Sequence, residues 1–144
     1  FGSRLHIACV FAQSPCCVLD FLYRLFNMPT MQCRHLLIKH QGSRNPVSRR
    51  TGESTSGVTR EQAQEEMQKW IDQINADGAT EEVFAKAAEQ RSDCGSFQKG
   101  GDLGEFGPGD MQKQFEDGTL ATPVGKMSGI VESDSGTHII FRTK

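Results

Sequence analysis

The stretch from Ser92 to Phe115, SDCGSFQKGGDLGEFGPGDMQKQF, organises the rest of the chain around a small site. It begins with a single cysteine, Cys94, in a turn rich in Ser, Asp and Gly. Its middle, residues 100–106, alternates apolar residues with glycines, as a short strand does where another backbone or a ligand comes close. The stretch therefore predicts a strand that lies beside a thiol.

The end of this stretch has the features of a helix start. Asp110 is a suitable N-cap residue, and Met111 and Phe115, four residues apart, share one helical face. Together with Leu103 from the preceding strand, these two side chains predict a small apolar pocket beside Cys94. Taken alone, such side chains are more typical of a core than of a pocket, and an isolated cysteine is most often inert.

Two segments resemble one known family. Residues 100–116, GGDLGEFGPGDMQKQFE, closely resemble the signature of the parvulin family of peptidyl-prolyl cis/trans isomerases, and residues 134–144, DSGTHIIFRTK, resemble the ending of the same family. The resemblance implies the parvulin fold, an α+β domain with a four-stranded antiparallel sheet surrounded by helices, over residues 32–144. It also implies isomerisation of Xaa-Pro peptide bonds without a cofactor or a metal.

Sequence patterns on either side predict the remaining elements. Residues 33–40 form a compact apolar run with strand character. A capping box starts a helix at Thr59, and a second helix starts at Thr80. Two strands, residues 127–132 and 137–142, close the chain. This order of elements by itself indicates an α+β domain with a mixed or antiparallel sheet.

The resemblance implies a role for eight residues. Those implied to hold the proline ring and the peptide backbone are Leu103, Met111, Gln112 and Phe115. Those implied to act at the rotating bond are His35, Cys94, Ser135 and His138, with the histidines hydrogen-bonded to each other and Ser135 tuning that pair. The barrier to rotation is roughly 18–20 kcal/mol and is set by amide resonance. A dry pocket that favours the twisted amide therefore accelerates the reaction.

A basic loop suggests recognition of phosphate. The run HLLIKHQGSR is similar to the strand and loop with which phospho-specific parvulins bind phosphate through a lysine and two adjacent arginines. Lys39 and Arg44 fall on the first two of these positions, but Asn45 occupies the third. Arg49 or Arg50 could supply the missing charge. Without the resemblance, such a cluster would be interpreted as a solvated loop. With it, we expect a preference for phospho-Ser/Thr-Pro that is weaker than in relatives with both arginines.

Composition narrows the class of protein. A net charge of −2 over 144 residues gives no global basic surface for nucleic acid or for a membrane. The odd number of cysteines is no disulfide framework, so we expect a reducing location inside the cell, in the cytoplasm or nucleus. We also expect a monomer. Residues 1–27 differ in composition from the rest, and we expect a disordered extension or leader before an isomerase domain of residues 28–144. The only tryptophan, Trp70, falls inside a predicted helix, so we expect no tryptophan-flanked (WW) binding domain.

Two alternatives stay open from the sequence, and two others lack support. The runner-up is a phosphopeptide-binding or chaperone-like module with little catalysis. A secreted folding isomerase without phosphate preference is another. A hydrolase that uses Cys94 with a histidine base lacks a nucleophile motif around the cysteine. A metal site built from Cys33, His35, Cys94 and His138 matches no known ligand spacing.

Overall fold

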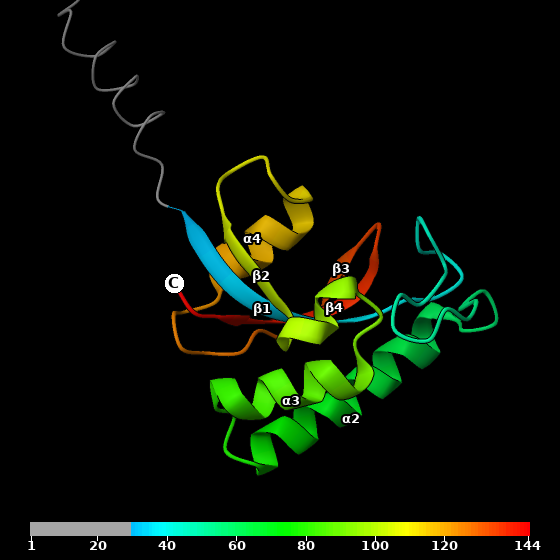
Figure 1. The fold of residues 1–144 in the computed structure, drawn as a ribbon, viewed down its shortest axis with the longest axis horizontal. Helices are drawn as coiled ribbons and strands as arrows, with labels where there is room; N and C mark the ends of the chain where they lie inside the picture. Colours follow the sequence, from blue (N-terminus) through cyan, green and yellow to red (C-terminus); the bar gives the residue numbers. More distant parts are fainter. Residues whose placement is uncertain (1–29) are drawn as a thin grey trace, which may run out of the picture.

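The structure is a computed structural model that describes residues 30–144. The predicted N-terminal extension, residues 1–27, and its boundary with the isomerase domain lie outside the described residues. Four antiparallel strands form one sheet in the order β2-β1-β4-β3 (Figure 1). These strands are β1 (Met31–Ile38), β2 (Asp102–Phe106), β3 (Val131–Ser133) and β4 (Gly136–Arg142). The predicted four-stranded antiparallel sheet is confirmed.

Helices cover both faces of this sheet. One face carries α2 (Arg60–Ala76) and α3 (Glu81–Arg91), and the other carries α4 (Lys113–Ala121), as Figure 1 shows. The short 3-10 helix η1 (Gly95–Lys99) connects α3 to β2. Of the helices in residues 30–144, none is both long and apolar enough to cross a membrane.

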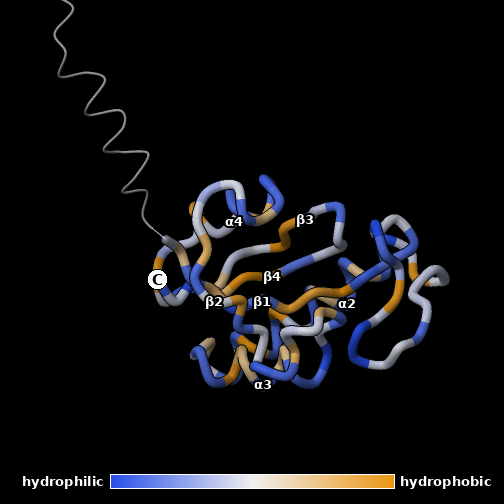
Figure 2. The backbone as a smooth tube through the Cα atoms, turned by 45° about the horizontal axis from the view of Figure 1, so that its top comes forward, coloured by the Kyte–Doolittle hydropathy of each residue, from blue (hydrophilic) through white to orange (hydrophobic). Residues whose placement is uncertain are grey.

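The alternation of side chains along β1 explains why the molecule has two apolar clusters. Leu36 and Ile38 point to the α2–α3 side, where they pack with Met67, Phe84 and other residues. Cys33 points to the α4 side, where it joins a smaller cluster that includes Phe115. Because β1 is central, both faces are buried, and the hydrophobic segments in Figure 2 follow the strands. The α4 side is the side that also holds His35.

The two long helices begin where the sequence predicts. The Thr59 hydroxyl accepts a hydrogen bond from the Gln62 amide, and the Gln62 side chain accepts one from the Thr59 amide, which completes the capping box. The Thr80 hydroxyl accepts a hydrogen bond from the Val83 amide at the start of α3. These local bonds satisfy amide groups that a helix start leaves without partners.

The strand predicted at residues 33–40 spans Met31–Ile38 instead, and two further predicted boundaries are wrong. Helix α4 begins at Lys113, with Gln112 as its N-cap, because the Asp110 carboxylate instead accepts a hydrogen bond from the Gly107 amide and closes a turn. The predicted strand 127–132 is reduced to β3, since Met127 makes only an isolated bridge to Phe141. At Asp110 the reason is a hydrogen bond within a turn, and at Met127 it is a single bridge in place of a continuous pairing. The hydrophobic pattern reveals neither.

A close approach of two backbones joins β2 to β1. Gly101 accepts a hydrogen bond from the His35 amide at 2.9 Å, and its φ is +77°. A Cβ atom at Gly101 would lie 2.3 Å from the His35 carbonyl oxygen. Only glycine fits there, which agrees with the prediction that glycines in residues 100–106 mark a close backbone contact.

Candidate active site

An apolar cavity of about 180 Å³ opens between β1, β2, α4 and the β3–β4 hairpin. It is lined by His35, Leu37, Cys94, Leu103, Met111, Gln112, Phe115, Ser133, Ser135 and His138. The structure therefore brings together all eight residues that the resemblance implied, from segments that are about a hundred positions apart at the extremes. Their roles in a reaction stay a prediction, but their neighbourhood is a property of the fold.

Two histidines form the floor of this cavity. His35 on β1 and His138 on β4 have their Nδ1 atoms 3.2 Å apart, and their rings are stacked with centroids 5.4 Å apart. The outer nitrogen of each ring meets a hydroxyl: His35 Nε2 lies 3.1 Å from Ser96 Oγ, and His138 Nε2 lies 2.7 Å from Ser133 Oγ. The result is a chain of four hydrogen-bonded side chains, Ser96, His35, His138 and Ser133, that runs across the α4 face of the sheet.

The serine that bonds to this pair differs from the one assigned from the sequence. Ser133, the last residue of β3, makes the hydrogen bond to His138, whereas the Ser135 side chain makes no hydrogen bond to either imidazole. The reason is the tight connection between β3 and β4, in which Ser133 pairs with Gly136 and Ser135 lies in the turn. Ser135 donates its backbone amide to Ser133 Oγ at 3.2 Å and lines the rim of the cavity.

Phe115 keeps water away from the histidines. Its ring meets His35 edge-on at a centroid distance of 5.5 Å and His138 at 5.2 Å. His138 is 3% exposed, and burial together with the neighbouring His35 charge holds the pKa of His138 well below its usual range. A buried imidazole beside a second imidazole favours the neutral form. His138 therefore supplies a fixed, neutral hydrogen-bonding group beside His35.

The environment of the Cys94 thiol favours its charged form, in contrast to that of His138, which favours the neutral form. Burial raises the pKa of Cys94, but the hydrogen bond and charge of His35 and the hydroxyl and amide of Ser96 outweigh burial and lower the pKa to about 6. The side chain stays partly exposed at the mouth of the cavity. Cys94 is thus a thiolate at neutral pH, and it faces the position that a ligand would occupy.

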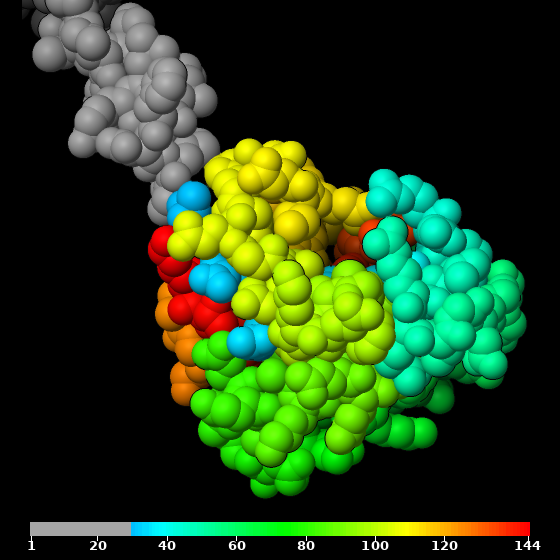
Figure 3. Space-filling view, in the orientation of Figure 1, coloured from blue at the N-terminus to red at the C-terminus, as the bar shows by residue number. Residues whose placement is uncertain are grey.

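A second, polar cavity of about 200 Å³ adjoins the first. It is lined by Leu37, Lys39, Arg44, Asn45, Arg49, Cys94 and Ser135. Leu37, Cys94 and Ser135 line both cavities, so the two form neighbouring subsites of one surface depression. Figure 3 shows this face hollowed between the α4 region and the loop that follows β1. An elongated ligand with an apolar end and an anionic end fits this division.

Three cations face the polar cavity. The Lys39 ammonium donates to the Val47 carbonyl at 2.7 Å, which points it across the loop, and burial and the Arg49 charge lower the pKa of Lys39. The Arg44 amide donates to the Asp134 carbonyl at 2.6 Å, which anchors the loop on the β3–β4 turn. Of the two further arginines considered from the sequence, Arg49 lines the cavity and Arg50 is not among the lining residues.

Three residues of the site were missed from the sequence. Leu37 shares a strand face with His35 and Lys39, so the period of two could have identified it. Ser96 lies in η1, and Ser133 ends β3, where no periodic signal distinguishes one serine from its neighbours. In the described range 30–144, no group of three or more His, Cys, Asp and Glu side chains is placed to hold a metal ion.

Comparisons with known proteins agree with this geometry. Residues 35–144 match the model of the rotamase family, described as the PPIC-type PPIase domain. A Theileria annulata protein named peptidyl-prolyl cis-trans isomerase NIMA-interacting 1 is 41% identical over 118 residues, which are 82% of each chain. A Digitalis lanata protein named peptidyl-prolyl cis-trans isomerase Pin1 is 44% identical over 115 residues, 78% of this chain and 95% of that one.

Solved structures show the same similarity. The solution structure of TbPIN1 has a TM-score of 0.70 and 54% identity, and the match covers 80% of this chain and 97% of that one. The structure of peptidyl-prolyl isomerase ESS1 from Candida albicans has a TM-score of 0.73 and 33% identity, with 88% of this chain and 72% of that chain covered.

Proposed function

The chain belongs to the PPIC-type, or parvulin, family of peptidyl-prolyl cis/trans isomerases, and from that premise we propose that it prefers Xaa-Pro bonds preceded by phosphorylated Ser or Thr. The observation that supports this preference is the pair of adjoining cavities. One is apolar and suits a proline ring, and the other carries Lys39, Arg44 and Arg49. Leu37, Cys94 and Ser135 form the wall that the two cavities share.

The apolar cavity promotes rotation by differential binding. A twisted Xaa-Pro amide has lost the resonance that makes the planar amide rigid, and with it much of the charge separation between nitrogen and oxygen. An apolar site around the ring, made by Leu103, Met111 and Phe115, stabilises the twisted form relative to the planar forms. Gln112 also lines this cavity, and its buried Oε1 has no hydrogen-bond partner in the described residues, so its amide can hold the peptide backbone.

The polar groups act on the carbonyl side of the rotating bond. Cys94 borders both cavities, so the carbonyl that precedes proline passes beside its sulfur. A thiolate there disfavours the partial negative charge on the oxygen of the planar amide, which is an electrostatic role and forms no covalent bond. His35 and His138 hold Cys94 and the cavity floor in position through their bonds to Ser96 and Ser133.

The polar cavity recognises the phosphate. A phosphoserine carries roughly −1.5 to −2 charges at pH 7 and three acceptor oxygens. Lys39 offers a point charge, while Arg44 and Arg49 offer planar donors that match phosphate geometry. Because Arg49 faces the same cavity, it supplies the third cation in place of the arginine that Asn45 replaces. Both arginines are exposed, so solvent weakens each contact.

Paired peptides test this proposal. The exchange rate between cis and trans forms is measured by NMR for a Ser-Pro peptide and for its phosphorylated twin, with enzyme in catalytic amounts. We expect acceleration of both and a higher kcat/KM for the phosphorylated peptide. Equal kcat/KM values would contradict the phosphate preference, and tight phosphopeptide binding without acceleration would favour the binding-module alternative.

We also propose that the protein acts as a monomer in the cytoplasm or nucleus. The support is compositional: the near-zero net charge and a cysteine content that suits a reducing compartment. Light scattering of the purified chain and imaging of a tagged chain in cells test the two statements separately.

A further inference from the structure

A buried carboxylate lies behind the phosphate cavity and holds its cationic loop. Asp93 is 2% exposed, and it immediately precedes Cys94. Its carboxylate accepts a hydrogen bond from the Lys39 amide at 3.0 Å, and its carbonyl accepts one from the Arg49 amide at 3.0 Å. Its own amide donates to the Leu37 carbonyl at 2.7 Å. One residue thus positions the backbone of two of the three cations.

This arrangement creates an electrostatic problem for anion binding. An uncompensated carboxylate behind a phosphate site repels the ligand, and burial makes the effect larger than in water. It also attracts the Lys39 ammonium. This attraction raises the pKa of Lys39 and opposes the effects of burial and Arg49, which lower it. The site therefore needs a countercharge for Asp93 that is not one of the phosphate-facing cations.

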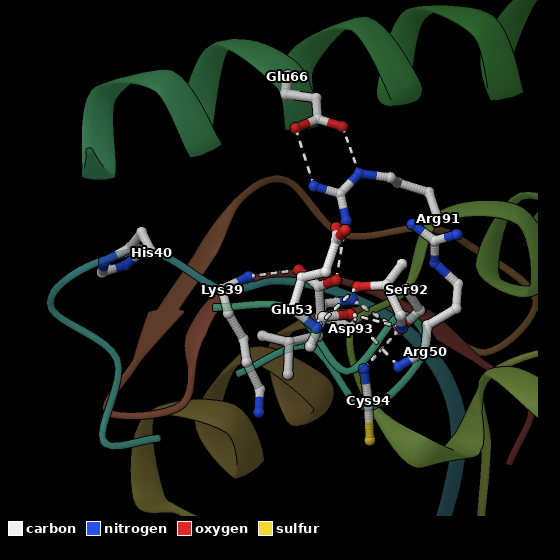
Figure 4. Close-up of polar contacts among 12 residues, drawn as sticks. Lys39, His40, Arg50, Glu53, Glu66, Arg91, Ser92, Asp93 and Cys94 are labelled. Atoms are coloured by element: carbon white, nitrogen blue, oxygen red, sulfur yellow. Dashed lines mark hydrogen bonds and ion pairs between the residues drawn. The ribbon is translucent and has the colours of Figure 1, made fainter. Parts of the chain in front are cut away.

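Arg91, the last residue of α3, supplies that countercharge from the side away from the cavity. Its Nη1 lies 3.1 Å from Asp93 Oδ1. Its Nη2 donates to Glu66 Oε2 on α2 at 3.0 Å, and its Nε donates to Glu66 Oε1. Figure 4 shows the guanidinium between the two carboxylates, with Glu66 on the helix and Asp93 beside Lys39 and Cys94. Because both carboxylate oxygens of Glu66 accept hydrogen bonds from Arg91, they fix the direction in which the guanidinium points.

We propose that Arg91 is a positioning residue for phosphate recognition: it neutralises Asp93, oriented by Glu66, so that Lys39, Arg44 and Arg49 present their full charge to the ligand. The inference rests on the proposed phosphate preference. Arg91 does not line either cavity, so it acts through Asp93 and not by touching the peptide. Burial opposes its charge, but Glu66 and Asp93 outweigh burial and raise the pKa of Arg91, so the countercharge is permanent.

The charge on Arg91 has a different consequence for each subsite. The phosphate cavity feels the net charge of Asp93 and Arg91, while the apolar cavity binds an uncharged ring by exclusion of water. Removing the charge therefore raises KM for a phosphopeptide and leaves the plain peptide nearly unaffected. A purely structural role would impair both peptides alike, because Cys94 borders both cavities.

A matched pair of variants tests the inference. Arg91→Gln keeps a donor toward Asp93 but loses the charge, whereas Arg91→Lys keeps the charge and loses the planar fork. For Arg91→Gln we expect KM for the phosphopeptide to rise roughly 2- to 30-fold, the range seen for residues that act on a site without touching its ligand, with kcat little changed. Arg91→Lys should recover most of this loss.

A double variant separates charge from packing. Arg91→Gln combined with Asp93→Asn removes both charges while an amide oxygen can still accept from Lys39, so KM for the phosphopeptide should fall again relative to Arg91→Gln alone. Thermal unfolding of each variant identifies any that fail to fold. If Arg91→Gln alone is unstable, the double variant is compared with the wild type, whose KM for the phosphopeptide it should approach.

Three outcomes overturn the inference. One is an unchanged KM for phosphopeptide in Arg91→Gln, another is an equal loss on the plain peptide, and the third is a double variant that is no better than the single one. A wild-type protein without phosphate preference instead refutes the proposed function, and this is measured before any variant, so the two failures are distinguishable.

Discussion

His35 and His138 share one hydrogen bond between their Nδ1 atoms, 3.2 Å apart. Such a bond requires a proton on one Nδ1 and a lone pair on the other, so the two rings must adopt opposite roles. If both rings were protonated, two N–H groups would point at each other. The structure thus disfavours protonation of both rings, and burial of His138 disfavours a positive charge on that ring.

Acid should destabilise the protein through His138. Because the pKa of His138 is lowered in the folded state, the unfolded chain binds more protons below about 6.5, the ordinary value. The free energy of unfolding should then rise with pH through this window and be lost as pH falls toward the folded pKa. Urea unfolding between pH 5 and pH 7.5 measures it. A His138→Gln variant should show a shallower slope, and an unchanged slope would contradict the assignment.

Cys94 should react as a thiolate at neutral pH. With a pKa of about 6, its alkylation by iodoacetamide should reach half its maximal rate near pH 6, and not near the ordinary value of 9.0. Mass spectrometry of the Cys94 peptide follows the rate. Cys33 is an internal control, because burial raises its pKa to about 12 and it should stay unmodified in the folded protein. A Cys94 profile centred near pH 9 would disprove the role of His35 and Ser96.

Gly101 should be far less replaceable than Gly104. Both have positive φ, but a Cβ at Gly101 meets the His35 carbonyl, whereas a Cβ at Gly104 meets nothing within 4 Å. We expect Gly104→Ala to cost about 1 kcal/mol of unfolding free energy from backbone strain alone. Gly101→Ala should cost more than about 3 kcal/mol, because β1 and β2 must separate. Denaturant unfolding compares the two, and similar losses would refute the close contact.

Met111 should contribute to catalysis but not to phosphate selection. It is half-buried and lines only the apolar cavity, so Met111→Ala should lower kcat/KM roughly tenfold, about 1.4 kcal/mol, for plain and phosphorylated peptides alike. The ratio of the two kcat/KM values should stay unchanged. Unfolding curves control for stability. Full activity in the folded variant would mean that Met111 is core and that the proline pocket lies elsewhere.

Arg49 should select phosphate and Arg50 should not. Arg49→Ala should reduce the ratio of phosphorylated to plain kcat/KM roughly 3- to 10-fold, because a hydrogen bond to a charged group is lost at an exposed position. Arg50→Ala is the matched control and should preserve the ratio.

Arg44→Ala should also reduce the ratio of phosphorylated to plain kcat/KM, and Asn45→Arg should raise it. The ratio should fall with added salt. Equal effects at Arg49 and Arg50 would indicate a loop that is merely solvated.

Much of the fold follows from local sequence. The capping box of α2, the Thr80 cap of α3 and the hydrophobic periods of both helices depend on residues within a few positions of one another, so the sequence alone predicts them. The apolar run at residues 33–40 likewise predicts a strand, although β1 spans Met31–Ile38 and Lys39 follows its end. Motif similarity then identified the family and the residues that surround the cavity, because those motifs lie in continuous segments.

The tertiary structure decided which of several residues of the same type contacts the histidines or lines the phosphate cavity. Ser133 contacts His138 and Ser135 does not, because the hairpin places one serine on the strand and the other in the turn. Arg49 faces the phosphate cavity because the Asp93 carbonyl holds its amide, a contact between segments more than forty residues apart. The sequence by itself determined the elements and the family, since these depend on neighbours along the chain. Partner choice at the site depends on the approach of distant segments, which no local pattern encodes.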